Sequence, residues 1–107
     1  MYKAMFALNR AEGTSHEEFA RHWQDDHAPI AIEGVPDLLK YTISFPDDPD
    51  SAAYDGVAEL YFEDEATCRE GLDSEAMGEA VADVPNFADP NDVLQLMVEE
   101  HVQVDRT

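Results

Sequence analysis

Residues 2–8 alternate between the two faces of an extended chain. Tyr2, Ala4, Phe6 and Leu8 share one of these faces. Because successive side chains of a strand point to opposite sides, a period of two predicts a β-strand with one buried face. The chain is therefore expected to begin with a half-buried strand.

Three later segments are also predicted to be strands. Residues 39–45 and residues 57–62 are rich in aromatic and β-branched side chains, which favour strands. Residues 93–104 contain a further apolar run. The residues expected on the buried side of this last strand are Leu94, Leu96 and Val98.

The first helix is predicted to begin at Ser15, because Glu18 three residues later completes a capping-box signature. Phe19, Trp23 and His27 then recur every four residues and form one row that should face the sheet. Pro29 lacks an amide proton and disfavours a helical residue before it, so the helix should end or kink there.

A short helical segment is expected over residues 29–33, after the proline. A second helical stretch is predicted over residues 65–83, with a break near Asp73 and Ser74. Acidic or turn-rich loops are expected over residues 46–55 and 86–92.

The order strand, helix, strand, strand, helix, strand predicts a ferredoxin-like α+β sandwich formed by one domain over residues 1–107. Two right-handed βαβ units give a four-stranded antiparallel sheet with both helices on one face. The other face is expected to be too apolar for a monomer, so two copies should pair into an α/β barrel as a homodimer. The residues predicted on that face are Met5, Ala7, Glu59, Tyr61, Gln95 and Met97.

The composition is strongly acidic, with 25 Asp and Glu against 6 Lys and Arg and a formal net charge of -19. Such a chain repels phosphates, so nucleic acid and anionic membrane surfaces are not expected as partners. The composition resembles that of salt-adapted haloarchaeal proteins, and stability should rise with salt as repulsion is screened. Residues 1–10 have no cleavage-site pattern and predict a cytoplasmic protein. The single cysteine, Cys68, is interpreted as structural.

Three stretches together resemble a known family. They are WQDDHAP at residues 23–29, YDGVAELYF at 54–62 and FADPNDVLQLMVEE at 87–100. The chain is similar to the EthD-like group of dimeric α/β-barrel proteins, in which a tryptophan and a histidine-alanine-proline lie near the end of the first helix. The resemblance implies a cofactor-independent domain that binds small, mostly apolar organic molecules between helix and sheet. Its members are associated with ether degradation, aromatic polyketide tailoring and lactone isomerisation.

The resemblance assigns the functional histidine to His27. The unperturbed pKa of histidine lies near neutrality, so this side chain can abstract a proton, donate one, or hydrogen-bond a carbonyl. A purely structural bond from its ring to a backbone carbonyl freed by Pro29 is the alternative. Asp25 and Asp26 are expected at a solvated helix end, where they would raise the pKa of His27.

Glu59 is the second catalytic candidate, because an acid in an apolar strand is costly unless it is paired or faces a wet cavity. Its alternative is a hydrogen bond in the dimer interface. Tyr41 and Tyr61 are candidates for orienting a carbonyl or hydroxyl, although strand tyrosines more often only pack. Trp23 is a candidate substrate contact that would otherwise belong to the core.

No metal site is predicted. Glu18, His22 and Asp26 form one helical row, but three ligands on consecutive turns span roughly 12 Å, too far for one ion. No cofactor is predicted either, because neither a dinucleotide fingerprint nor a basic cluster for haem propionates is present.

The leading hypothesis is a small cofactor-free enzyme of lyase, isomerase or oxygenase type. Its substrate would be a small organic molecule with an acidic C–H or an enolisable carbonyl, and His27 would transfer the proton or bind the carbonyl. The alternative hypothesis is a non-catalytic ligand-binding or stress-associated module that uses the same pocket.

Overall fold

The computed structural model describes all 107 residues and contains one sheet with helices on one side. Its elements in chain order are β1 (Tyr2–Arg10), α1 (His16–His22), η1 (Trp23–His27), α2 (Ala28–Gly34), β2 (Lys40–Ser44), η2 (Pro49–Ser51), β3 (Gly56–Phe62), α3 (Glu65–Leu72), α4 (Glu75–Asp83), η3 (Val84–Asn86) and β4 (Ala88–Glu99).

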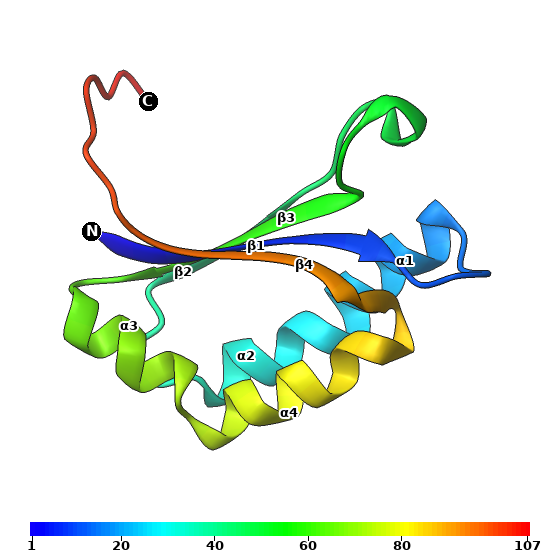
Figure 1. Cartoon of the computed structure of the whole chain (residues 1–107). Helices are drawn as coiled ribbons and strands as arrows, with labels where there is room; N and C mark the ends of the chain where they lie inside the picture. The colour runs from blue at the N-terminus through cyan, green and yellow to red at the C-terminus, as the bar shows by residue number, and fades with distance from the viewer.

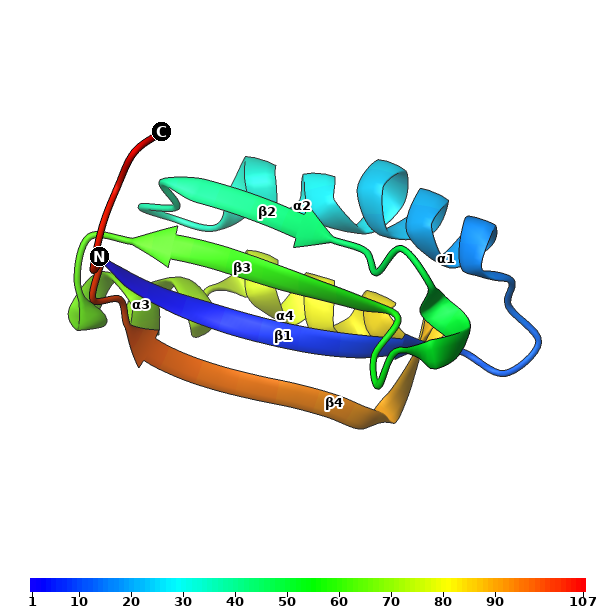
Figure 2. The ribbon, with the colours of Figure 1, turned by 90° about the horizontal axis from the view of Figure 1, so that it is seen from above.

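The sheet is antiparallel with strand order β2-β3-β1-β4. The α-helices all lie on one face of it, and the strands are not covered by helices on the other face (Figures 1 and 2). This is the predicted ferredoxin-like α+β fold. No helix is both long enough and apolar enough to cross a lipid bilayer.

The first helix does not end at the proline. Ser15 caps α1 by accepting a hydrogen bond from the amide of Glu18 at 3.1 Å, as predicted. The chain then widens into the π-helical turn η1, in which the amide of Ala28 bonds the carbonyl of Trp23, and α2 follows directly. The predicted departure of Ala28 from helical geometry is wrong, because the wider turn accommodates Pro29 without a break.

The second helical stretch is interrupted where the sequence predicts. α3 ends at Leu72, and Ser74 starts α4 by accepting a hydrogen bond from the amide of Met77 at 3.2 Å. α4 packs against α2 on the same side of the sheet (Figure 1). The two helices therefore form one wall of the space between the helices and the sheet.

The predicted limits and orientation of the last strand are wrong. β4 begins at Ala88 and ends at Glu99, so most of the expected loop before residue 93 is strand. Pro90 has no amide proton to donate to a neighbouring strand. It is tolerated because β4 is an edge strand, where one side needs no hydrogen-bond partner. Because Ala7 pairs with Leu94 and Phe6 with Gln95, the side chains are turned over relative to the prediction.

The uncovered face therefore carries Leu94, Leu96 and Val98, whereas Gln95 and Met97 point toward the helices. Met5, Ala7, Glu59 and Tyr61 lie on the uncovered face as predicted, because they alternate with the buried Ala4, Ala58, Leu60 and Phe62.

The core lies between the sheet and the helices. Its largest fully buried side chains are Trp23, Phe19, Phe62, Phe87 and Cys68. The rings of Phe19 and Trp23 meet edge to face at 5.4 Å. A Cβ on Gly56 would stand 2.7 Å from the Trp23 ring, so this glycine lets the indole lie directly on the backbone of β3.

Candidate functional site

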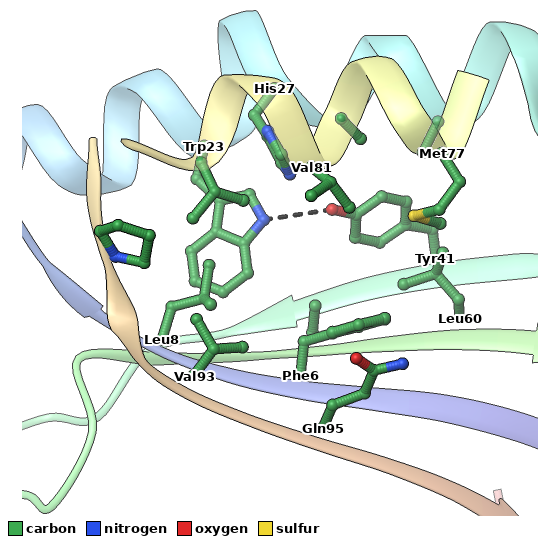
Figure 3. Close-up of a pocket in the computed structure, with 15 residues that line it drawn as sticks. Phe6, Leu8, Trp23, His27, Tyr41, Leu60, Met77, Val81, Val93 and Gln95 are labelled. Atoms are coloured by element: carbon green, nitrogen blue, oxygen red, sulfur yellow. Dashed lines mark hydrogen bonds between the residues drawn. The ribbon is translucent and has the colours of Figure 1, made fainter. Parts of the chain in front are cut away.

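A cavity of about 260 Å³ opens between α4, the η1–α2 segment and the sheet (Figure 3). Most of its lining is apolar, with a few polar side chains among them, as in ordinary small-molecule sites. The lining residues are Phe6, Leu8, Trp23, His27, Ala31, Tyr41, Ala58, Leu60, Met77, Ala80, Val81, Val84, Pro90, Val93 and Gln95.

His27 lies at the wall of this cavity, at the last position of the π-helical turn. The residue is 8% exposed, and its ring packs against Phe87 with centroids 4.9 Å apart. Its Nδ1 lies 2.8 Å from Oδ2 of Asp83 at the end of α4. The predicted inward direction of the Phe19–Trp23–His27 row is confirmed by the burial of all three side chains.

The second ring nitrogen of His27, Nε2, has no hydrogen-bond partner in the protein. It is also not sealed inside, because every fully buried side-chain nitrogen or oxygen does have a partner. Figure 3 shows the ring pointing down beside Trp23 and Val81 into the cavity. Nε2 is therefore free to meet a ligand.

Burial lowers the pKa of His27 below its ordinary value of 6.5, and this effect outweighs the opposing hydrogen bond and charge of Asp83. The predicted rise caused by Asp25 and Asp26 is wrong: Asp26 points outward to Arg21 and His22. His27 is thus uncharged at neutral pH, with one nitrogen able to accept a proton.

Asp83 is the acid that contacts the histidine. Burial works to raise its pKa, but hydrogen bonds from Asn86, His22 and His27 outweigh burial and lower the pKa. Asn86 donates to Oδ1 at 3.0 Å, and His22 Nε2 lies 2.9 Å from Oδ2. The carboxylate is therefore ionised and held from three sides.

Trp23 and Tyr41 meet inside the cavity. The indole Nε1 of Trp23 donates to the hydroxyl oxygen of Tyr41 at 3.1 Å (Figure 3). Burial raises the pKa of Tyr41, so its phenol stays protonated. Since the oxygen already accepts from Trp23, the Tyr41 proton is available to a ligand oxygen.

The structure does not bring Glu59 or Tyr61 to this cavity. Both lie on the uncovered face of β3, on the opposite side of the sheet from His27. Glu59 accepts a hydrogen bond from the Lys3 ammonium at 2.8 Å, and Thr42 Oγ1 lies 3.4 Å from the Glu59 carboxylate. Lys3 also lies over the ring of Tyr61, 5.1 Å from the centroid.

Sequence reasoning missed Asp83, His22 and Gln95. Asp83 is 56 residues from His27, and no local spacing links the two. His22 looked like part of a solvated row, yet its ring turns to Asp83 and stacks on Phe87. Gln95 was missed because the strand register was inverted; in Figure 3 its amide lies across the cavity from His27.

No three His, Cys, Asp or Glu side chains are arranged to hold one metal ion. Cys68 is buried, and burial raises the pKa of its thiol, so the thiolate that nucleophilic chemistry requires is disfavoured.

The EthD domain model matches residues 11–91, which is more than half of the chain. The chain belongs to the EthD family. No curated protein matches its sequence. Within the family, the fold is also that of an EthD family protein from Bacillus halodurans, with a TM-score of 0.76 and 18% identity over 94% of this chain and 100% of that one.

Two further crystal structures have the same fold as this EthD chain. HapK from Hahella chejuensis gives a TM-score of 0.72 at 12% identity, covering 100% of this chain and 98% of that chain. A point mutant of SnoaB, a cofactor-independent oxygenase from Streptomyces nogalater, gives 0.67 at 12% identity, covering 98% of this chain and 95% of that chain. At these identities the similarity establishes the fold alone.

Proposed function

We propose that this EthD protein is a cofactor-independent enzyme that deprotonates a small, neutral organic compound next to a carbonyl group. One observation carries the proposal: the uncharged His27 ring bonds Asp83 through Nδ1 and leaves Nε2 free at an apolar cavity. A base of this kind contributes about 10²–10⁴-fold to a proton transfer.

In the proposed step the lone pair of His27 Nε2 takes a proton from the carbon beside the carbonyl. The electrons of the broken C–H bond form the enolate double bond, and the negative charge moves to the carbonyl oxygen. Tyr41 donates its hydroxyl proton in a hydrogen bond to that oxygen. Lyase, isomerase and oxygenase reactions can each begin with this deprotonation.

The cavity supports a narrow substrate class. Its volume of about 260 Å³ lies just below the roughly 300–1,000 Å³ range of sites for drug-sized ligands, which suits a compound of about one ring. No Lys or Arg lines it, so a carboxylate or phosphate would enter without a counter-charge. We therefore expect a neutral ketone, ester or lactone. The fold shared with SnoaB, named a cofactor-independent oxygenase, is compatible with this chemistry.

We propose that Glu59 and Tyr61 act in a homodimer interface and not in catalysis. The uncovered face carries the apolar row of β4, with Leu94 and Leu96 43% and 46% exposed. The C-terminal segment and the β2–β3 connection both rise on this side of the sheet (Figure 1). A second copy packed there would cover the apolar row around the Lys3–Glu59 pair. Light scattering that found a monomer at high salt would refute this.

The net charge of -19 supports a further proposal, that the protein works in a cytoplasm of high salt concentration. At molar salt the Debye length is about 3 Å, so repulsion between surface carboxylates is screened. The melting temperature should rise steadily as KCl is increased from about 0.1 M to about 2 M. A flat or falling curve would contradict salt adaptation.

The test of the proposed reaction needs no knowledge of the final product. A panel of neutral one-ring ketones and lactones is incubated with the protein in D₂O, and loss of the proton signal beside the carbonyl is followed by NMR. The rate of exchange should fall about 10²–10⁴-fold in His27→Ala. His101→Ala, which removes an exposed histidine outside the cavity, should leave the rate unchanged.

Two results would overturn the enzyme proposal. One is exchange that is equally fast in the His27→Ala variant. The other is a compound that binds the cavity but exchanges no proton with any variant, which would favour the non-catalytic binding module.

A further inference from the structure

The carboxylate of Asp83 lies between two imidazole rings. Its Oδ2 is 2.8 Å from Nδ1 of His27 and 2.9 Å from Nε2 of His22. An ionised carboxylate only accepts hydrogen bonds, so each of these nitrogens must carry a proton toward it. A neutral imidazole has one donor and one acceptor nitrogen. In His27 the acceptor is therefore Nε2, which faces the cavity.

His22 is itself fixed from several sides. Its ring stacks on Phe87 with centroids 4.8 Å apart and planes inclined by 18°. Its Nδ1 lies 3.4 Å from Oδ2 of Asp26, and its side chain is only 18% exposed. Phe87 also contacts the ring of His27. The two imidazoles, the shared carboxylate and Phe87 thus form one packed unit between the cavity and the surface.

We propose that His22 is a positioning residue for His27, acting through the carboxylate they share. By donating to Oδ2 of Asp83, His22 keeps the carboxylate in the position where it receives Nδ1–H of His27. The hydrogen bond from His22 also offsets part of the negative charge of Asp83. Nε2 of His27 then stays an acceptor directed at the ligand; the functional meaning of this arrangement rests on the proposed proton transfer.

The charges around the pair explain why a second histidine matters. Asp83 on α4 alone would favour the positive form of His27, which cannot accept a proton. The other titratable groups that face the His27 ring are His22 on α1 and Tyr41 on β2. Any positive charge on His22 opposes a second positive charge on His27, and Asp26 lies on the far side of the His22 ring.

The test reads the two rings directly by ¹⁵N NMR of the imidazole nitrogens, as a function of pH and without substrate. His22→Phe keeps an aromatic ring against Phe87 but removes the donor to Asp83. His22→Gln keeps an amide donor near the position of Nε2. His101→Gln removes an exposed histidine whose ring pairs with Glu99, away from the cavity, and serves as the matched control.

In His22→Phe we expect the neutral form of His27 to become a mixture of both tautomers, because the carboxylate of Asp83 is no longer held against Nδ1. His22→Gln should restore the single Nδ1–H tautomer, and His101→Gln should match the unmodified protein. His22→Met, which also lacks a donor, provides the same comparison should the phenylalanine variant not fold.

The proposal is overturned if His27 in the donor-free variant keeps the single tautomer of the unmodified protein. It is also overturned if the Gln and Phe variants change His27 equally, because the bond to Asp83 would then be irrelevant. Neither result depends on turnover, so failure of this inference is distinguishable from failure of the proposed reaction.

Discussion

The two faces of the sheet differ in how a basic side chain responds to a neighbouring carboxylate. On the uncovered face, Lys3 and Glu59 form a direct ion pair at 2.8 Å, and Lys3 reaches Glu100 at 3.2 Å as well. The hydrogen bond from Lys3 to Glu59, more than any other effect, raises the pKa of Lys3, against the opposing effect of burial. On the covered face, His27 remains uncharged although a carboxylate touches it.

The difference shows where titration chemistry can occur. The Lys3 ammonium, whose pKa is raised, stays charged across the physiological range and so can fix position but cannot exchange protons. His27 lies deeper, where loss of solvation outweighs the carboxylate, lowers the pKa of the ring and leaves it uncharged and able to accept a proton. The same sheet therefore separates a fixed charge pair from a proton-transfer group.

The largest expected effect is on the uncovered face. Leu96→Asp would place a carboxylate from each copy in the proposed interface, and burying unpaired charges costs several kcal/mol. The dimer dissociation constant should increase by more than about 100-fold, measured by analytical ultracentrifugation in high salt. Ile32→Asp, a change at an exposed apolar position on α2, away from the uncovered face, is the control and should leave the dimer intact.

The next effect concerns the covered face. Asp83→Asn removes the negative charge that three donors share, and we expect a loss of about 1–3 kcal/mol in the free energy of unfolding. Proton exchange should fall by roughly 100-fold or more, because the His27 tautomer is no longer imposed. Denaturant titration and the D₂O exchange assay measure the two. Unchanged exchange would show that Asp83 serves stability alone.

The pH dependence of stability should distinguish the two faces. The pKa of His27 is lowered below 6.5, so between the two values the unfolded chain binds the proton and the folded chain does not. The contribution of His27 to the free energy of unfolding is fully present above about pH 6.5, and this contribution is lost as the pH falls below that value. The pKa of Lys3 is raised above 10.5, so its contribution is lost only at much higher pH.

We therefore expect the free energy of unfolding to fall between about pH 7 and about pH 5, and to fall less in His27→Gln. Lys3→Met should keep the slope of the unmodified protein over this range. Equal slopes in the unmodified protein and His27→Gln, obtained from urea titrations at each pH, would contradict the lowered pKa.

The smallest effect is on ligand selectivity. Gln95 is a polar side chain on the strand floor of the cavity, opposite His27 (Figure 3). Gln95→Leu should lower the binding affinity for ligands with a second polar group by about two- to tenfold. The affinity for ligands with a single carbonyl should not change. Calorimetric titration of matched ligand pairs measures the difference, and an equal loss for both members would argue against a specific contact.

Local rules were sufficient for most elements. The alternation in β1, the Ser15 cap and the break before Ser74 are all found where the sequence predicts them. Each depends on residues within one or two turns of each other. The burial of Trp23 and His27 also follows from helical spacing, since their row faces the sheet.

Predictions failed where two periods or two distant segments compete. β4 is apolar on both faces, so its alternation did not reveal which face meets the helices; only pairing with β1 decides this. Pro29 predicted a break, yet a π-helical turn absorbs it and keeps His27 against the cavity. The two ends of this turn, Trp23 and His27, pack against Gly56 and Phe87, which lie far away in the sequence, so local propensity alone cannot anticipate it.

The sequence by itself determined the order of strands and helices, the family, and the histidine that borders the cavity, because these depend on short-range periodicity and local motifs. Only the tertiary structure decided that Asp83 reaches His27 and His22 across 56 and 61 residues, and that Glu59 lies on the other side of the sheet. Such contacts are set by how α4 settles against the first helix, and no residue near His27 in the chain encodes that distance.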